Sequence, residues 1–327
     1  MSSGKKILLS AVKPTGRPHI GNYFGAMRQF VELQEQYETL IMIADYHALT
    51  TAPNPAVLRS DIVDLAIDYL AIGLDPAKVI LFKQSDVPEH TELAWIFECL
   101  TTVPYLLRAH AYKDATVKKQ EANVGLLTYP MLMAADILLY DTDVVPVGQD
   151  QKQHLEMARD TAEKFNRLYG ETFKPPQALI LEEVETVPGI DGRKMSKSYN
   201  NTIPLFANDE EIKRLVMSIV TDSKDVAEPK NPEECNIFVL HKLFSQEQLP
   251  ELKKRYVNGG IGYRESKEIL VENIIKFIAP LREKRTEVAS NKTNVLRILK
   301  NGAELARERA RLKMTKIKEK IGVNLEI

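Results

Sequence analysis

The chain has 327 residues and a mass of 37.0 kDa, a length that predicts one large domain and one smaller one. Hydrophobic residues make up 44% of it and charged residues 27%, with 15 Gly and 17 Pro, which excludes collagen-like, low-complexity and disordered chains. Forty-four Lys and Arg balance 45 Asp and Glu, so contact with nucleic acid must rely on a local basic patch.

Cysteine content and hydropathy predict a cytoplasmic, soluble protein with no membrane partner. The two cysteines, Cys99 and Cys235, lie far apart and outside any CxxC motif, which argues against a disulfide framework and a structural zinc site. The apolar run near the N-terminus is too short for a signal peptide, and no stretch is long enough to span a bilayer.

The first part of the chain alternates strand and helix patterns. Short apolar runs predict buried strands at 6–12, 40–45 and 79–83. Helical spacing of apolar residues predicts helices after them, at 19–37, 53–73 and 89–99. This alternation predicts an α/β fold, a Rossmann-like doubly wound parallel sheet whose carboxyl edge binds ligands.

The middle of the chain continues the alternation of strand and helix patterns, whereas the last third has helix patterns alone. Segments 126–140 and 150–170 predict helices, with a strand at 143–148 between them. After a loop rich in Gly, Ser, Asn and Lys, only helix patterns remain. We therefore expect a catalytic domain at 1–204, including the loop at about 189–202, and an all-helical domain at 205–327. The last helix is basic and can pack back on the first domain.

Two polar motifs carry the expected chemistry. The first, Lys13-Pro14-Thr15-Gly16 followed by His19-Ile20-Gly21-Asn22, joins the first strand to its helix, where free N–H groups and the helix dipole favour an anion. His19 and Asn22 share one helical face, and Gly21 lets a planar base approach. The motif predicts a nucleotide cradle; the alternative is a turn with a capping histidine.

The second motif is Lys194-Met195-Ser196-Lys197-Ser198, preceded by Gly189 and Gly192. Two lysines on a hinged loop can close on a pyrophosphate and neutralise the charge that builds on this leaving group. Taken alone, the motif is also compatible with a solvated lysine loop.

The pair of motifs resembles the HIGN and KMSKS signatures of the class I aminoacyl-tRNA synthetases. Segment 129–160, YPMLMAADILLYDTDVVPVGQDQKQHLEMARD, resembles the amino-acid pocket of the tryptophanyl-tRNA synthetases, as do GNYFGAMRQF at 21–30 and VTDS at 220–223. The resemblance implies a homodimer that activates L-tryptophan with ATP and Mg²⁺ and transfers it to tRNA(Trp). The helices after 205 would then bind the anticodon.

The resemblance also assigns roles to individual residues. Catalysis would fall to His19, Asn22, Lys194 and Lys197. ATP would contact Lys13, Pro14, Thr15, Gly21, Asn22, Gly148, Gln149, Asp150, Val187, Lys194, Met195, Ser196, Lys197 and Ser198. Asp150 can equally be a helix N-cap. No protein ligands for Mg²⁺ are expected, because phosphate oxygens and water would hold the ion.

The predicted tryptophan pocket is built around Asp136. Tyr129, Met133 and Asp136 share one helical face, and the carboxylate lies in an apolar stretch. By resemblance, Asp136 accepts the indole N–H; the alternative is that it pairs with an arginine or caps a helix. The remaining pocket residues would be Gln151, Val145, Val147, Leu9 and His47, although His47 could also be a structural histidine.

Some features depart from the family, and rival functions stay open. Lys13 replaces the usual glutamine, and the segment 108–125 diverges from the common pattern. The nearest rival is a tyrosyl-tRNA synthetase, which shares both signatures. Other rivals are a smaller nucleotidyltransferase and a non-catalytic paralogue that binds tRNA or tryptophan.

Overall fold

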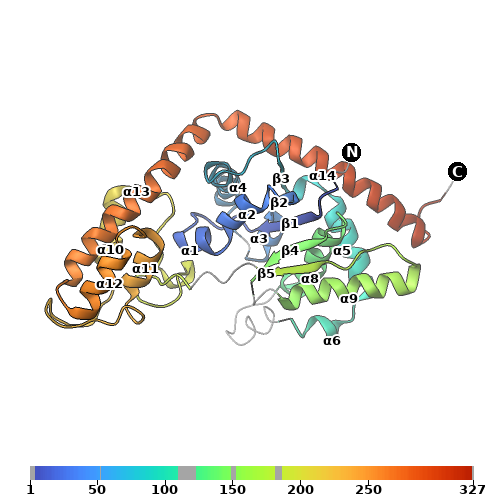
Figure 1. Cartoon of the computed structure of the whole chain (residues 1–327). Helices are drawn as coiled ribbons and strands as arrows, with labels where there is room; N and C mark the ends of the chain where they lie inside the picture. Colours follow the sequence, from blue (N-terminus) through green and yellow to red (C-terminus); the bar gives the residue numbers. More distant parts are fainter. Residues whose placement is uncertain (1–3, 52, 110–122, 149–151, 181–185, 326–327) are drawn as a thin grey trace.

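The fold centres on a parallel sheet. The computed structural model describes residues 4–51, 53–109, 123–148, 152–180 and 186–325, drawn in colour in Figure 1. The sheet has five parallel strands in the order β3-β2-β1-β4-β5. Their bounds are β1 Ile7–Val12, β2 Glu38–Ile43, β3 Val79–Lys83, β4 Val144–Val147 and β5 Gln177–Ile180. The doubly wound parallel sheet predicted from the sequence is confirmed, with β5 as an additional edge strand that the sequence pattern did not reveal.

Both faces of the sheet are buried, which explains why its strands read as continuous apolar runs. In β2, Leu40 and Met42 point into one hydrophobic core and Ile41 and Ile43 into the other, and all four are fully buried. One core is covered by α5 (Glu89–Leu100), α8 (Val124–Leu138) and α9 (Lys152–Tyr169). The other is covered mainly by α2 (Arg28–Leu33) and α4 (Pro55–Ala71). The strands therefore form a rigid platform for the loops at their carboxyl ends.

The first crossover is not one regular helix. It consists of α1 (Ile20–Asn22), a π-helical segment η1 (Tyr23–Met27) and α2. In η1, Phe24 packs against Phe244 and Phe277 at ring-centroid distances of 5.3 and 5.6 Å. The helix that follows the first motif is thus attached directly to the C-terminal helical region.

Short elements complete the first part of the chain. They are α3 (Asp45–Ala48), η2 (Leu49–Thr51), η3 (Gln84–Asp86), α6 (Val103–Leu106) and η5 (Lys197–Tyr199). No helix in the described ranges is long and apolar enough to cross a membrane.

The last third of the chain is helical and has two parts, a lobe at one end of the molecule and a long helix over the sheet (Figure 1). Its helices are α10 (Asp209–Met217), α11 (Asn236–Phe244), α12 (Leu249–Asn258), α13 (Tyr263–Ser290) and α14 (Lys292–Lys320). The first three form a lobe at one end of the molecule with the start of α13, whereas α14 runs back over the sheet (Figure 1).

Helix α14 packs closely against the edge strand β3. A Cβ atom added at Gly302 would lie 2.0 Å from the Leu81 carbonyl oxygen, so only glycine allows this approach. The hydrophobic core also runs across position 205, because Ile41 of the sheet shares a cluster with Ile212 and Leu270 of the helical region.

Candidate active site

The topology brings the predicted site residues to one place. Strands β1 and β4 are neighbours, although β2 and β3 lie between them in sequence, so the strand order reverses at this pair. Such a switch point opens a crevice at the carboxyl ends of the strands. The loop that starts at Lys13 follows β1, and Gly148 follows β4. Gln149, Asp150 and Gln151 lie outside the described residues, as does most of the divergent segment 108–125.

His19 is the N-cap of α1 and forms a reciprocal pair with Asn22. The Asn22 backbone N–H donates to His19 Nδ1 at 3.2 Å, and the His19 N–H donates to Asn22 Oδ1 at 3.1 Å. Burial, with a smaller effect of the Lys197 charge, lowers the pKa of His19 to about 4. The imidazole is therefore neutral at pH 7. Because Nδ1 accepts, the ring proton lies on Nε2, which can donate to an anion.

The lysine loop contacts this first motif directly. Lys197 Nζ donates to the carbonyl oxygens of Thr15 and Gly16 at 2.7 and 3.0 Å. A backbone bridge joins His19 to Pro204, and the Ile20 N–H donates to the Ile203 carbonyl at 3.0 Å. Two motifs that lie about 180 residues apart in sequence therefore form one site.

Met195 anchors the loop while its charged neighbours stay outside. Its side chain is 4% exposed in the hydrophobic core, and its N–H donates to the Val187 carbonyl at 2.9 Å. A Cβ atom at Gly21 would lie 3.4 Å from the Met195 Cβ and 3.0 Å from His19 Nδ1. Gly21 thus allows the loop and the first helix to approach closely.

Asn201 holds the loop in shape, and no sequence pattern pointed to this residue. This residue is 1% exposed, and its side chain accepts from the Ser196 N–H at 2.8 Å and donates to the Lys194 carbonyl at 3.1 Å. Ser196 and Ser198 share a hydroxyl hydrogen bond of 2.9 Å. Lys194 itself is exposed and, within the described ranges, has no side-chain ion pair.

Lys13 connects the nucleotide loop to the predicted amino-acid pocket. Its ammonium lies 5.9 Å from the ring centroid of Tyr129, a cation–π distance. Burial lowers the pKa of Lys13. The adjacent Pro14 is buried, whereas Thr15 is exposed and turns its carbonyl to Lys197.

Asp136 is 1% exposed and is held by three side chains. His47 Nε2 lies 2.8 Å from Oδ2, His90 Nδ1 lies 2.7 Å from Oδ1, and the Gln84 amide donates to both oxygens at 2.8 and 3.0 Å. Burial alone would raise the pKa of Asp136, but the two histidines hold it well below its usual range. The carboxylate is therefore ionised at neutral pH and has no arginine partner among the described residues.

Neither Gln84 nor His90 was found from the sequence. Gln84 is fully buried directly after β3. His90, which contacts Asp136 through Nδ1, also forms a 2.8 Å hydrogen bond with the Tyr140 hydroxyl through Nε2 and so extends the polar network around Asp136. A polar residue at the carboxyl end of a predicted parallel strand is the signal that could have pointed to Gln84.

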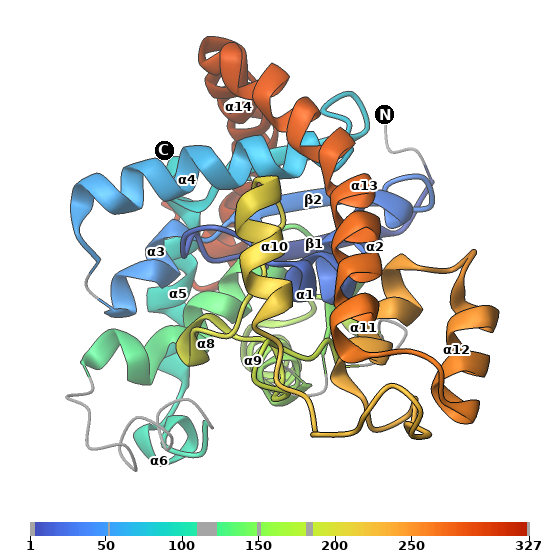
Figure 2. The same cartoon turned by 90° about the vertical axis from the view of Figure 1, so that its left-hand side faces the viewer.

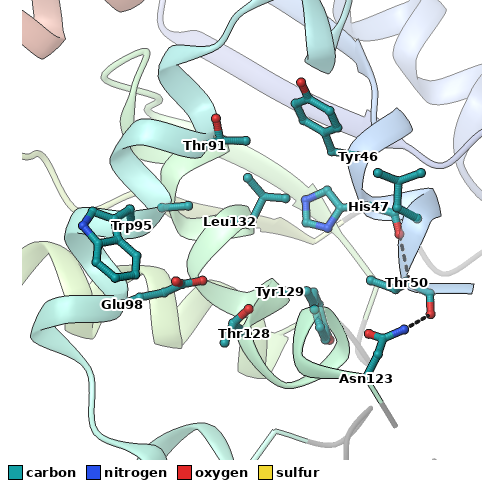
Figure 3. A pocket seen from close by; sticks show the side chains of 13 residues that line it. Tyr46, His47, Thr50, Thr91, Trp95, Glu98, Asn123, Thr128, Tyr129 and Leu132 are labelled. Atoms are coloured by element: carbon teal, nitrogen blue, oxygen red, sulfur yellow. Dashed lines mark hydrogen bonds between the residues drawn. The ribbon is translucent and has the colours of Figure 1, made fainter. Parts of the chain in front are cut away.

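The other predicted pocket residues fall into two groups. Leu9, Val145 and Val147 are buried in the core on the Asp136 side, with Met133 partly buried against them. His47 and Tyr129 instead line a cavity of about 370 Å³ between α3, α5 and the start of α8, seen in Figure 3. Trp95 and Glu98 stand on the opposite side of this cavity. His47 therefore connects the cavity to Asp136, with the Tyr129 ring beside it.

Comparison with known proteins decides the family. Residues 1–279 match the family model described as tRNA synthetases class I (W and Y). A tryptophan–tRNA ligase of Fusobacterium nucleatum is 51% identical over 317 residues, which cover 96% of this chain and 97% of the relative. The chain belongs to the class I tryptophanyl-tRNA synthetases.

Solved structures of this family agree with that assignment. The tryptophanyl-tRNA synthetase of Campylobacter jejuni, solved with ADP and tryptophan, superposes with a TM-score of 0.91 at 46% identity and covers 97% of this chain and 99% of its own. A tyrosyl-tRNA synthetase of Archaeoglobus fulgidus reaches a TM-score of 0.67 at 20% identity, a likeness of fold alone; it covers 87% of this chain and 91% of its own. The tryptophan branch is thus favoured over the tyrosine branch.

Proposed function

We propose that this chain charges tRNA(Trp) with tryptophan in two steps, as its family does. It is an ATP-dependent tryptophan–tRNA ligase. In the first step the tryptophan carboxylate attacks the α-phosphate of ATP, the bond to the β-phosphate breaks, and tryptophanyl-adenylate and pyrophosphate form. In the second, a ribose hydroxyl at the tRNA end attacks the mixed anhydride and AMP leaves.

The observation that supports the first step best is the contact of Lys197 with the first loop. A cation at the carbonyls of Thr15 and Gly16, beside a neutral His19 whose ring proton lies on Nε2, forms a donor cluster at a helix N-terminus. Such a cluster suits the charge that develops on a departing pyrophosphate. We propose that His19, Asn22, Lys194 and Lys197 act in this step by positioning and charge stabilisation, without a covalent intermediate.

We propose that ATP also contacts Lys13, Thr15, Met195 and Gly148 around the same crevice. Magnesium would enter with the nucleotide. In the described ranges no group of three or more His, Cys, Asp or Glu side chains could hold a metal ion. We propose that phosphate oxygens and water are its ligands, because Mg²⁺ usually keeps several waters and binds substrate phosphates, and that the ion neutralises phosphate charge.

We propose that Asp136 selects tryptophan by accepting the indole N–H, the only hydrogen bond that an indole can donate. Two histidines and Gln84 keep the carboxylate ionised and fixed, so it stays an acceptor at neutral pH. Gln84 bridges both oxygens, and a shift of its amide to one oxygen would free a lone pair for the indole.

The experiment that tests the function is tryptophan-dependent exchange of pyrophosphate into ATP, run with all twenty amino acids. We expect exchange with tryptophan and little with tyrosine. Exchange with tyrosine alone would establish the rival enzyme, and exchange with none would establish a non-catalytic paralogue.

We propose that the helical region from about residue 205 contacts the anticodon of tRNA(Trp) in the cytoplasm. Lys253 and Lys254 are exposed on α12, at the end of the molecule farthest from α9 (Figure 1). Replacing both by glutamate should weaken tRNA charging and its salt dependence but leave pyrophosphate exchange unchanged. An equal loss in both assays would contradict this division of labour.

We propose that two copies associate through the face that carries the cavity of Figure 3. Trp95 is 67% exposed, Val124 75% and Leu49 52%, and all three belong to elements around this cavity. Covering such side chains typically contributes about 1.5–3 kcal/mol each. Trp95→Glu should yield a monomer in light scattering, while a dimer that persists would place the interface elsewhere.

A further inference from the structure

Arg285 of α13 reaches back to helix α4, 217 residues away in sequence. Its Nε donates to Asp68 Oδ1 at 2.6 Å, and its Nη2 donates to Asp64 Oδ1 at 2.9 Å. Asp68 is only 2% exposed, and burial raises its pKa to about 6 even with Arg285 beside it. A buried carboxylate without a partner is strongly unfavourable, so Arg285 compensates a charge that α4 cannot satisfy alone.

This ion pair lies beside the loop that holds the lysine of the second motif. A cavity of about 390 Å³ is lined by Asp64 and Asp68 of α4, by Arg285 of α13, and by Arg17 and Pro18 of the first loop. Lys197 is bound to Thr15 and Gly16, directly before Arg17. Figure 2 shows α4 and α13 together on the side of the molecule that carries α1.

The carboxylates of α4 also act on Lys197 through space. Desolvation lowers the pKa of this ammonium, and the charges of Asp61 and Asp68 oppose that shift. Asp61, Asp64 and Asp68 follow i, i+3, i+7 and share one face of α4. Without Arg285, Asp68 would be a buried, unpaired carboxylate whose charge acts on Lys197 together with that of Asp61.

We propose that Arg285 is a positioning residue for Lys197: by occupying Asp68 and Asp64, it keeps these carboxylates from drawing the ammonium off the first loop and away from the triphosphate. The inference rests on the proposed role of Lys197 in adenylate formation. It makes helix α13 a determinant of the first chemical step, although the proposed contacts with ATP and tryptophan all lie before residue 205.

The alternative is that Arg285 merely fastens α13 to α4. The two roles differ in what happens to kcat of the folded protein. If the lost charge compensation acts on Lys197, kcat falls and neutralising Asp68 should restore it. If Arg285 is only a fastener, its loss leaves Asp68 buried and unpaired and lowers the free energy of unfolding, but kcat of the folded protein stays unchanged.

The test uses the full-length protein and pyrophosphate exchange with tryptophan. Arg285→Met should lower kcat by about tenfold and leave KM for tryptophan within about twofold, because an interaction specific to the transition state is lost. Arg285→Met combined with Asp68→Asn should recover kcat to within about threefold of the parent enzyme. Arg264→Met, which breaks an exposed ion pair with Glu268 on the same helix, is the matched control and should change neither value.

Two results would overturn the inference: an unchanged kcat in Arg285→Met, or a fall that Asp68→Asn does not reverse. If circular dichroism shows that Arg285→Met does not fold, Arg285→Gln replaces it, because glutamine retains N–H donors but has no charge. The same changes in kcat are then expected, and the same results would overturn the inference. Lack of tryptophan-dependent exchange in the parent enzyme would instead refute the proposed function.

Discussion

Replacement of Asp136 by asparagine probes the proposed pocket at its centre. The carboxylate makes four close contacts with His47, His90 and Gln84, all of which approach through nitrogen. In the amide, one oxygen becomes an NH₂ group, so at least one nitrogen donor faces another donor. Each unmatched buried polar group costs about 1–3 kcal/mol, so we expect about 2–4 kcal/mol of lost folding stability.

Selectivity should fall in the same variant, because the amide is a weaker acceptor for the indole N–H. A hydrogen bond to a charged group contributes about 1.5–3 kcal/mol, so discrimination of tryptophan against phenylalanine should drop roughly 10- to 160-fold. The assay is pyrophosphate exchange, with kcat/KM measured for both amino acids. Unchanged discrimination in folded protein would refute the assignment of Asp136.

The matched control is Tyr140→Phe, which removes the hydroxyl at the far end of the network without altering Asp136. It should destabilise the protein by about 1 kcal/mol and leave the discrimination unchanged. Loss of selectivity in this control as well would mean that disturbance of the network, and not the acceptor itself, is responsible.

Three further substitutions test other features. Gly21→Ala should lower kcat of exchange by about tenfold with little effect on stability, because its Cβ would press on His19 Nδ1; an unchanged kcat would show that this approach is unimportant. Gly302→Ala should destabilise the protein by about 2 kcal/mol or more in urea unfolding, because the Leu81 backbone must shift; a smaller loss would mean that α14 moves freely. Burial lowers the pKa of His241 to about 4 from 6.5, so its stabilising contribution is complete above pH 6.5 and is lost as the pH falls toward 4. That loss is about 2 kcal/mol at pH 5, and His241→Gln should remove it from the pH profile of unfolding; a profile like that of the parent would exclude this histidine as its source.

Local patterns predicted the elements that depend on local sequence. The apolar runs of β1, β2 and β3 and the helical spacing of α4, α5 and α9 predicted these elements to within a few residues. Strand β5 was missed because it has only four residues at the edge of the sheet and therefore little periodicity. The π-helical turn of η1 was missed because its packing against Phe244 and Phe277 comes from distant sequence.

In the site, too, local sequence predicts some features, and contacts between distant segments determine the others. The meeting of His19 and Lys197 could be expected, since both motifs follow from residue types and their place beside the sheet. The partners Gln84 and His90 of Asp136 could not, because they approach from η3 and α5, which are distant in sequence. The pairing of Arg285 with Asp68 joins residues 217 positions apart and is visible only after folding.

The packing of α14 on β3 has a consequence for synthesis. The strand ends at Lys83, whereas the helix that covers it begins at Lys292, so more than 200 residues emerge from the ribosome before the cover exists. During that interval the outer backbone groups of β3 can pair with water, with a chaperone or with another nascent chain. Completion of the nucleotide-binding sheet is therefore tied to translation of the last helix.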